Sequence, residues 1–295
     1  MKEITALVSR NRKLFFKDKG MLFSSMITPV ILIVLYATFL ANVYKDSFVS
    51  ATKDMIDLSD KIINGTVAAQ LAAALLAVSC VTVTFCVNLT MVQDRASGAR
   101  KDFDVSPVSK TKIYIGYFLS TVLNSLMVNG TALALCLLYI LKMGWYMSAS
   151  DVIFVILDMI LLVLFGSTLS SIVSYPLKTQ GQLSAVGTIV SAGYGFVCGA
   201  YMPISNFSSG LQKALSYLPG TYGTSLVKNH MLNGVYKEMA DTGLPSEAVT
   251  VIRNTLDCNP VFRGHVGVSQ MYLIMAGSIV VFGAAYLLII MIRER

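Results

Sequence analysis

Six long apolar stretches, separated by polar and charged segments, dominate the pattern of residues along the chain. Each stretch is close to the roughly 20 residues that a helix needs to cross the hydrocarbon core of a bilayer. Helices are expected because a spanning segment must satisfy its backbone hydrogen bonds internally. The predicted spans are residues 21–41, 66–91, 113–141, 152–173, 183–201 and 268–292. The pattern therefore predicts an all-α integral membrane protein with six transmembrane helices.

The first segment of the chain, residues 1–20, differs from the spans because its apolar and basic positions recur with helical periodicity. Leu7 and Phe15 share one helical face, whereas Arg10 and Lys17 lie on the other. This pattern predicts an amphipathic elbow helix that lies in the membrane interface and leads into the first span. The remainder, residues 21–295, is expected to form a single transmembrane domain.

Charge is scarce in this chain and unevenly distributed. Hydrophobic residues make up 55% of it and charged residues 13%, against roughly 25% charged in soluble domains, which excludes a soluble globular enzyme. Fourteen of the 23 Lys and Arg residues fall in segments that one side of a six-span protein would expose. The positive-inside rule then places both termini and the loop 93–112 in the cytoplasm. The net charge of +7 reflects this topology, so no nucleic acid is expected as a partner.

The segment 201–267 is the longest connection between two predicted spans and would lie outside the membrane. Its first part has leucines at helical spacing, which Pro219 interrupts, and residues 246–256 read as a second short amphipathic helix. Residues 202–232 are too apolar to be fully solvated. We therefore predict an external helical segment, part of which re-enters the bilayer.

The loop 93–112, QDRASGARKDFDVSPVSKTK, combines charge, glycine and proline. Asp94 and Arg95 close the second span, and Gly98 permits a turn. Residues 101–105 can then form a short helix before a Ser-Pro pair redirects the chain. By itself this pattern fits two alternatives equally well, a helix that docks a partner and a solvated basic loop that only sets the topology.

The order of these features resembles the ABC-2 type transporter permease family. Shared features are the acidic-Arg pair, the glycine, the short charged helix and the SPVS motif ahead of the third span. The amphipathic elbow, the six spans and the large external region before the last span are similar too. A further point of resemblance is GAYMPI at 199–204, followed by LQKALSYLPGTYG. At the position of Asp94 the family more often has glutamate.

The resemblance implies the membrane subunit of an ATP-driven exporter. In that family the loop after the second span forms a coupling helix, which fits a cleft on a separate cytoplasmic ATP-binding subunit. The corresponding interface candidates are Asp94, Arg95, Gly98, Lys101, Asp102 and Pro107. The sequence has no GxxxxGK[ST] motif to cradle phosphates, so the partner subunit is expected to bind ATP and Mg²⁺, and this chain no cofactor.

The same resemblance implies that two copies, or one copy and a related permease, enclose a pathway in a bacterial-type plasma membrane. The expected cargo is amphipathic: a drug, an antibiotic peptide, a lipid or a lipid-linked glycan. The alternative is an ATP-independent secondary transporter or channel, which should show coupling charges near the midplane or inverted repeats. Asp158 is the ionisable residue available for such coupling.

Small and polar residues within the spans are the candidate pathway positions. One face of the fifth span has a small residue at every fourth position, which lets another helix approach closely within the subunit, across a dimer or along the pathway. These residues are Gly187, Ser191, Gly195 and Gly199. The polar candidates in other spans are Asn88, Asn124, Asn129 and Asp158.

No residue pattern indicates a metal or a catalytic site. His230 and His265 are the only histidines, which is too few for a metal centre. No Ser-His-Asp arrangement or pair of intramembrane carboxylates is present, so no catalytic residue is expected. The five cysteines have no disulfide or metal spacing, although a bridge between Cys198 and Cys258 stays open because both positions would face outside.

Overall fold

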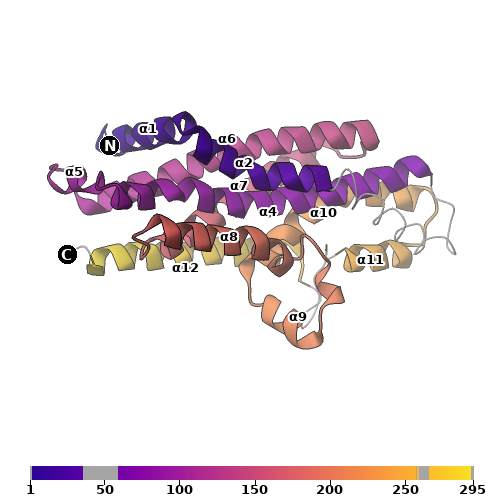
Figure 1. Ribbon diagram of the computed structural model, residues 1–295. Helices are drawn as coiled ribbons and strands as arrows, with labels where there is room; N and C mark the ends of the chain where they lie inside the picture. Colours follow the sequence, from indigo (N-terminus) through magenta and orange to yellow (C-terminus); the bar gives the residue numbers. More distant parts are fainter. Residues whose placement is uncertain (1, 36–58, 257, 259–265, 294–295) are drawn as a thin grey trace.

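The computed structural model describes residues 2–35, 59–256, 258 and 266–293, and every regular element within them is a helix. The elements are α1 (Lys2–Lys17), α2 (Lys19–Leu35), α4 (Asp60–Ala96), α5 (Arg100–Asp104), α6 (Lys110–Met143), α7 (Ala149–Ser174), α8 (Gln180–Val197), the 3₁₀ turn η2 (Ile204–Asn206), α9 (Ser209–Leu215), α10 (Pro219–Asp241), α11 (Ser246–Thr255) and α12 (Val268–Arg293). The long helices lie side by side in an elongated bundle (Figure 1). We name its two ends the α5 end, where α1 and the end of α12 also lie, and the α11 end. The predicted all-α architecture is confirmed.

The central helix of the bundle is α4, which packs against α2, α6, α7, α8 and α10. Nearly all of its residues are buried, as expected of a helix that is apolar on every side. Its 37 residues correspond to about 55 Å, which exceeds the roughly 30 Å of a bilayer core. Because α4 is buried and long, it connects the α5 end to the interior as one continuous rod.

Among the described residues, four helices are long and apolar enough to cross a membrane: α4, α6, α7 and α12. The first and fifth predicted spans correspond to the shorter helices α2 and α8. The structure describes α2 only as far as Leu35, so the rest of the predicted span 21–41 lies outside the described residues. A turn that begins at Cys198 ends α8 before the predicted limit at Tyr201. The count of six spans therefore stays a prediction.

The first helix, α1, runs alongside α6 instead of across the bundle (Figure 1). Contacts between the two helices recur at every fourth position of both: Glu3 with Lys112, Leu7 with Gly116, and Asn11 with Ser120. Leu7 and Phe15 are buried, whereas Lys17 is exposed. The amphipathic pattern thus buries one face of α1 on its neighbours, and the position of this helix in the membrane interface stays a prediction.

The segment 201–267 contains η2, α9, α10 and α11 among its described residues. α11 agrees with the short helix predicted at 246–256. Pro219, which was expected only to interrupt a helix, is the first residue of α10, where a missing N–H carries no penalty. α10 lies within the bundle against α4, α7 and α12, whereas η2 and α9 project from it (Figure 1).

The helices α8 and α10 occupy successive parts of the bundle along its length. Tyr194 in the last turn of α8 touches Gly220 in the first turn of α10. Further along α10, the amide of Asn233 donates to Asp151 in the first turn of α7 at 2.8 Å. α10 therefore occupies the α11 half of the bundle, and the buried turn that follows α8 lies beside it.

Candidate functional site

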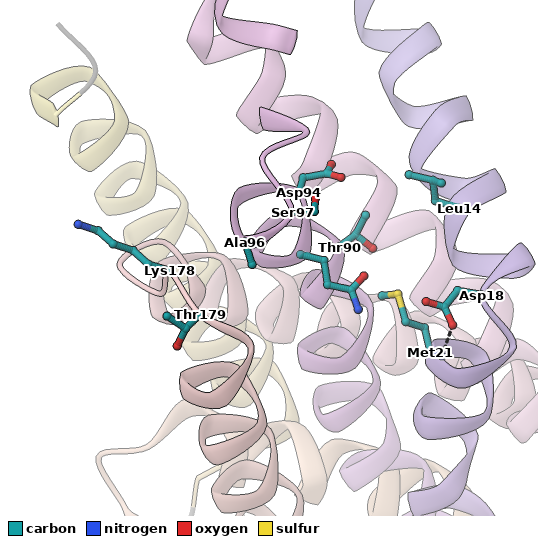
Figure 2. A pocket seen from close by; sticks show the side chains of 10 residues that line it. Leu14, Asp18, Met21, Thr90, Asp94, Ala96, Ser97, Lys178 and Thr179 are labelled. Carbon is teal, nitrogen blue, oxygen red and sulfur yellow. Dashed lines mark hydrogen bonds between the residues drawn. The ribbon is translucent and has the colours of Figure 1, made fainter. Parts of the chain in front are cut away.

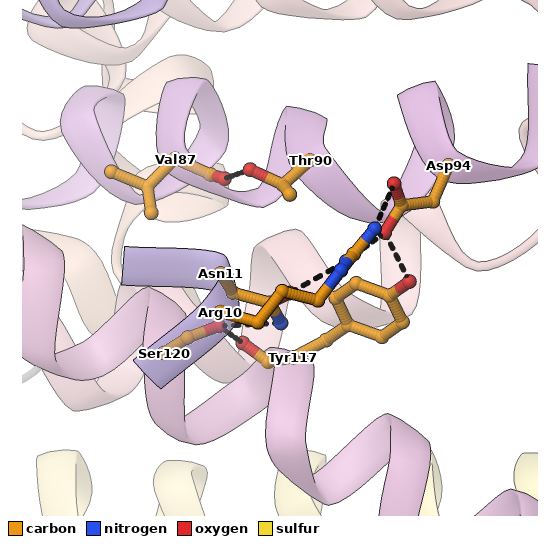
Figure 3. A network of polar contacts seen from close by, with 7 residues as sticks. All are labelled: Arg10, Asn11, Val87, Thr90, Asp94, Tyr117 and Ser120. Atoms are coloured by element: carbon orange, nitrogen blue, oxygen red, sulfur yellow. Dashed lines mark hydrogen bonds and ion pairs between the residues drawn. The ribbon is translucent and has the colours of Figure 1, made fainter. Parts of the chain in front are cut away.

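An ion pair and its hydrogen bonds join three helices at the α5 end (Figure 3). The carboxylate of Asp94, near the end of α4, accepts hydrogen bonds from the guanidinium of Arg10 in α1 at 2.6 and 3.0 Å. It also accepts the hydroxyl of Tyr117 in α6 at 2.6 Å. The hydrogen bond to Asp94 raises the pKa of Arg10 above its usual value. Only 6% of Asp94 is exposed, and its side chain holds these helices together.

Next to this ion pair, Arg95 ties α4 to the C-terminal end of α7. Its guanidinium donates to the carbonyl oxygens of Tyr175 and, at 3.2 Å, of Leu177. It also donates to the hydroxyl of Tyr114 in α6 at 3.1 Å. A cation is favourable at this position because the last carbonyls of a helix lack intrahelical partners and carry partial negative charge. Arg95 therefore fixes the ends of α4, α6 and α7 relative to one another.

The short helix α5 follows Asp94 and Arg95 in the chain. It begins and ends one residue earlier than the predicted helix 101–105. Gly98 makes the turn before it with a φ of +82°, in the left-handed region that glycine adopts without strain. The ring of Phe103 on α5 lies 4.9 Å from the guanidinium carbon of Arg10. α5 is thus fastened to the bundle through α1, as well as through its short connection to α4.

The outer face of this loop is open. Lys101, Asp102 and Pro107 are exposed, and Val105 exposes 88% of its surface. Val105 is thus an apolar side chain surrounded by charged ones, in a loop that is attached to several helices. Such an arrangement suits a docking contact, which typically has an apolar centre and a polar rim. Val105 was absent from the predicted interface set, although an apolar residue inside a charged loop was the available signal.

A cavity of about 780 Å³ opens beside the loop (Figure 2). Asp18, at the corner between α1 and α2, lies on one side of it, and Lys178, just before α8, lies on the other. Ser97 and the end of α4 form its floor. The cavity separates the α1–α2 corner from the start of α8, so these two parts have room to approach each other.

A second cavity, of about 540 Å³, lies between α2, α4 and α8, and we call it the α2/α4/α8 groove. Ile27 and Ile31 of α2 give it an apolar wall, and Ser184 and Thr188 of α8 add hydroxyl groups. Gly187 and Ser191, the first two residues of the predicted small face, line this groove. The groove thus offers apolar and hydrogen-bonding surface together.

The other two residues of the predicted small face build a turn. A Cβ atom at Gly195 would overlap the ring of Tyr201, which packs directly on this glycine. Gly199 follows the end of α8 with a φ of +72°. Gly187, Ser191 and Gly195 therefore lie on α8, whereas Gly199 does not continue their face, because the helix ends at Val197 and the chain reverses over its own last turn.

The three predicted polar asparagines lie inside the bundle and do not line the groove. Asn129 in α6 accepts a hydrogen bond from Ser79 of α4 at 2.7 Å, and Asn88 in α4 accepts one from Thr121 of α6 at 3.5 Å. Asn124 is buried, and neither atom of its amide has a partner among the described residues. Two of the three therefore connect α4 to α6.

Replacing Asn124 by leucine is expected to raise the free energy of unfolding by about 1 kcal/mol, because it removes an unpaired buried amide. Thermal unfolding in detergent measures this change. Asn129→Leu is the matched control and should destabilise, since it leaves the hydroxyl of Ser79 without its acceptor. Equal losses of stability in both variants would contradict the assignment, whereas stabilisation with a loss of transport would mark Asn124 as a pathway residue.

Asp158, the fourth polar candidate, joins α7 to α10 and α12. Its carboxylate lies 2.6 Å from Nδ1 of His230 and accepts the hydroxyl of Tyr272 at 2.7 Å. The ring of His230 stacks on Phe154 with centroids 5.0 Å apart. The sequence separates Asp158 and His230 into a span and an external segment, and they meet because α10 folds into the bundle.

The two cysteines considered for a disulfide, Cys198 and Cys258, are buried and form no disulfide with each other. Cys258 lies instead 3.3 Å from the hydroxyl of Tyr236 in α10. The possible bridge between them is therefore not present in this structure.

Comparison with known proteins identifies the chain. A family model described as ABC-2 family transporter protein matches residues 55–292. No curated protein matches the sequence. The matched residues include α4, the loop that carries α5, and the α4 and α8 walls of the groove. Since the match covers more than half of the chain, the protein belongs to the ABC-2 family and is a membrane permease of an ABC transporter.

Proposed function

We propose that this permease is worked by separate cytoplasmic ATP-binding subunits, which dock on the loop 93–112, and that it exports an amphipathic cargo. The observation that carries the proposal is the attachment of α5, which contacts α1 through Phe103 and α6 through Arg100, whose guanidinium carbon lies 4.6 Å from the ring of Tyr114. A short connection joins α5 to the end of α4, which Asp94 and Arg95 hold to α1, α6 and α7, while the outer face of the loop stays open. The partner would bind ATP and Mg²⁺ and supply the hydrolysis.

Such an attachment suits the transmission of movement. A partner can shift an equilibrium only between states that it contacts differently, so its push must reach a rigid element joined to the spans. Movement of α5 would carry the ends of α4, α6 and α7 with it, because the two arginines fasten them together. The 780 Å³ cavity beside the loop gives the α1–α2 corner room to follow.

The α2/α4/α8 groove is the proposed half-pathway. Its combination of isoleucines from α2 and hydroxyl groups from α8 fits an amphipathic molecule such as a drug, an antibiotic peptide, a lipid or a lipid-linked glycan. A second copy of the chain, or a related permease, would close the groove opposite Gly187 and Ser191. In this arrangement six spans cross the membrane, both termini are cytoplasmic, and the segment 201–267 is external or re-entrant.

The double substitution Lys101→Ala and Asp102→Ala is expected to weaken association with the ATPase about tenfold, as for loss of central interface residues. Transport should fall with it, while the amount of permease in the membrane stays constant. Co-purification in mild detergent and transport into vesicles measure the two effects. Lys237→Ala with Glu238→Ala is the matched control, because it removes a neighbouring pair of opposite charges from α10. Full coupling in the first variant would count against docking on α5.

The proposal as a whole is tested by a pull-down of the tagged permease from its native membrane, followed by identification of the bound proteins and an ATPase assay. An ATP-binding subunit should co-purify and should be lost when residues 93–112 are scrambled. A permease that purifies alone, without ATPase activity, would instead favour the ATP-independent carrier or channel.

A further inference from the structure

Lys228 of α10 is a buried lysine that the docking loop and the groove do not use. Only 1% of its surface is exposed, and its ammonium group donates to the carbonyl oxygen of Gly199 at 2.9 Å. Ionisable groups within a membrane bundle are costly and are therefore candidates for a functional role. The position of its acceptor, in the turn that ends α8, indicates what that role is.

The turn after α8 satisfies most of the helix's last carbonyl groups by itself. The N–H of Ala200 donates to the carbonyl of Gly195 at 2.9 Å, and the N–H of Gly199 donates to that of Phe196 at 3.2 Å. With Gly199 at a φ of +72°, this is the pairing of a Schellman motif. The carbonyl of Gly199 points away from the helix and is taken by Lys228.

A cation is well placed here for a physical reason. The C-terminal end of a helix carries partial negative charge. Phe196 and Val197, the last residues of α8, are exposed, but the turn formed by Cys198, Gly199 and Ala200 is buried, so water does not supply donors freely there. The ammonium of Lys228 provides a donor and a positive charge at this end. It thereby attaches the turn after α8 to α10, which itself packs against α4, α7 and α12.

The same turn positions a residue of the groove. Tyr201, which follows directly, packs on Gly195 and meets the ring of Phe196 edge to face at 5.1 Å. Its side chain also lines the α2/α4/α8 groove, together with Cys86. A displacement of the turn would therefore move Tyr201 relative to the groove.

We propose that Lys228 is a positioning residue that holds the turn 198–201 against α10 and so keeps Tyr201 at the end of the α2/α4/α8 groove. Release of this contact would open the groove at that end. The hold of Lys228 on the turn rests only on the contacts described above. Its consequence for cargo rests on the proposed function of the groove.

The native cysteines report on this contact. Cys198 lies within the turn and is buried, Cys86 lines the groove, and Cys80 is buried in the core of α4. Labelling of the purified full-length permease in lipid nanodiscs with a maleimide, read at each cysteine by mass spectrometry, follows all three sites at once. Cys80 serves as the internal control for global unfolding.

In Lys228→Met, the labelling of Cys198 is expected to rise about tenfold over the wild type, since a charged hydrogen bond to the turn is lost. Cys86 should react faster as well, while Cys80 stays protected. Lys228→Arg keeps a cationic donor and should behave as the wild type. Lys237→Met, at an exposed position of the same helix, is the matched control and should change nothing.

Unchanged labelling of Cys198 in folded Lys228→Met would overturn the proposal, and unchanged Cys86 alone would refute control of the groove. If Cys80 reacts in Lys228→Met, that variant has lost its fold, and Lys228→Gln is tested instead. Continued protection of Cys198 in Lys228→Gln would likewise overturn the proposal. The labelling needs no ATPase and no cargo. Failure of this proposal can therefore be distinguished from failure of the proposed function, which the pull-down tests alone.

Discussion

Replacing Asp94 by alanine is expected to lower the free energy of unfolding by about 2 to 3 kcal/mol, toward the low end for a buried ion pair because Arg10 is partly exposed. The substitution leaves the guanidinium of Arg10 and the hydroxyl of Tyr117 without their shared acceptor. It also detaches α1 from the end of α4. We therefore expect ATP-driven transport to fall more than the amount of folded permease does, as measured by vesicle transport normalised to protein that remains monodisperse in detergent.

A double-mutant cycle separates this ion pair from general effects of lost charge. Arg10→Met combined with Asp94→Ala should be less damaging than the two single effects added together, since neither partner is then left unpaired. The pair Glu3–Lys112 is the control, because it also ties α1 to a neighbouring helix, α6, at 2.7 Å but on the surface. Glu3→Ala should leave stability and transport unchanged. Additive effects of the Arg10 and Asp94 substitutions would show that the pair does not act as a unit.

Replacing Asp158 by alanine is the second change with a large expected effect, a loss of about 2 to 4 kcal/mol in the free energy of unfolding. It removes the acceptor that joins α7 to His230 of α10 and Tyr272 of α12. α10 should then separate from the bundle more readily. Thermal unfolding and protease sensitivity of the segment 201–267 measure this change.

Asp158→Asn distinguishes a structural role from a role in coupling. The amide keeps an oxygen that can accept the hydroxyl of Tyr272, so most of the stability should return. If transport returns with it, Asp158 holds the helices together. A stable Asp158→Asn permease that no longer transports would instead support the carrier alternative, in which this carboxylate takes part in ion coupling.

The turn and the short helix in the loop 93–112 were foreseen from local signals, and tertiary contacts decide how the loop is attached. Gly98, the charged run and the Ser-Pro pair predict a turn, a short helix and a redirection of the chain, and these rules act over a few residues. They do not show that Asp94 and Arg95 face inward, because the partners of these side chains lie in α1, α6 and α7. The predicted interface set consequently contains Asp94 and Arg95, which bond to other helices, together with the exposed Lys101, Asp102 and Pro107, and it omits Val105.

In the segment 201–267, pairs of residues far apart in the chain decide where a helix lies, and local composition does not. The apolar character of residues 202–232 predicted a partly re-entrant segment, but it gave no partners for Lys228, His230 and Asn233 of α10. In the fold each of these groups meets a partner: Gly199 for the lysine, Asp158 for the histidine and Asp151 for the asparagine. Burial of a polar helix is tolerated when its polar groups are hydrogen-bonded. Composition reports the average environment of a residue and does not report such individual pairs.

What the sequence by itself determined is the membrane composition, the all-helical architecture and the family resemblance. These follow from apolar length and from backbone hydrogen bonding, which in a bilayer leave the helix as the structure for a single spanning segment. Only the tertiary structure decided where α8 ends, that α10 lies inside the bundle, and which charged groups pair across helices. The physical reason is that pairing and close packing depend on distances between residues far apart in the chain, about which a pattern of single positions carries no information.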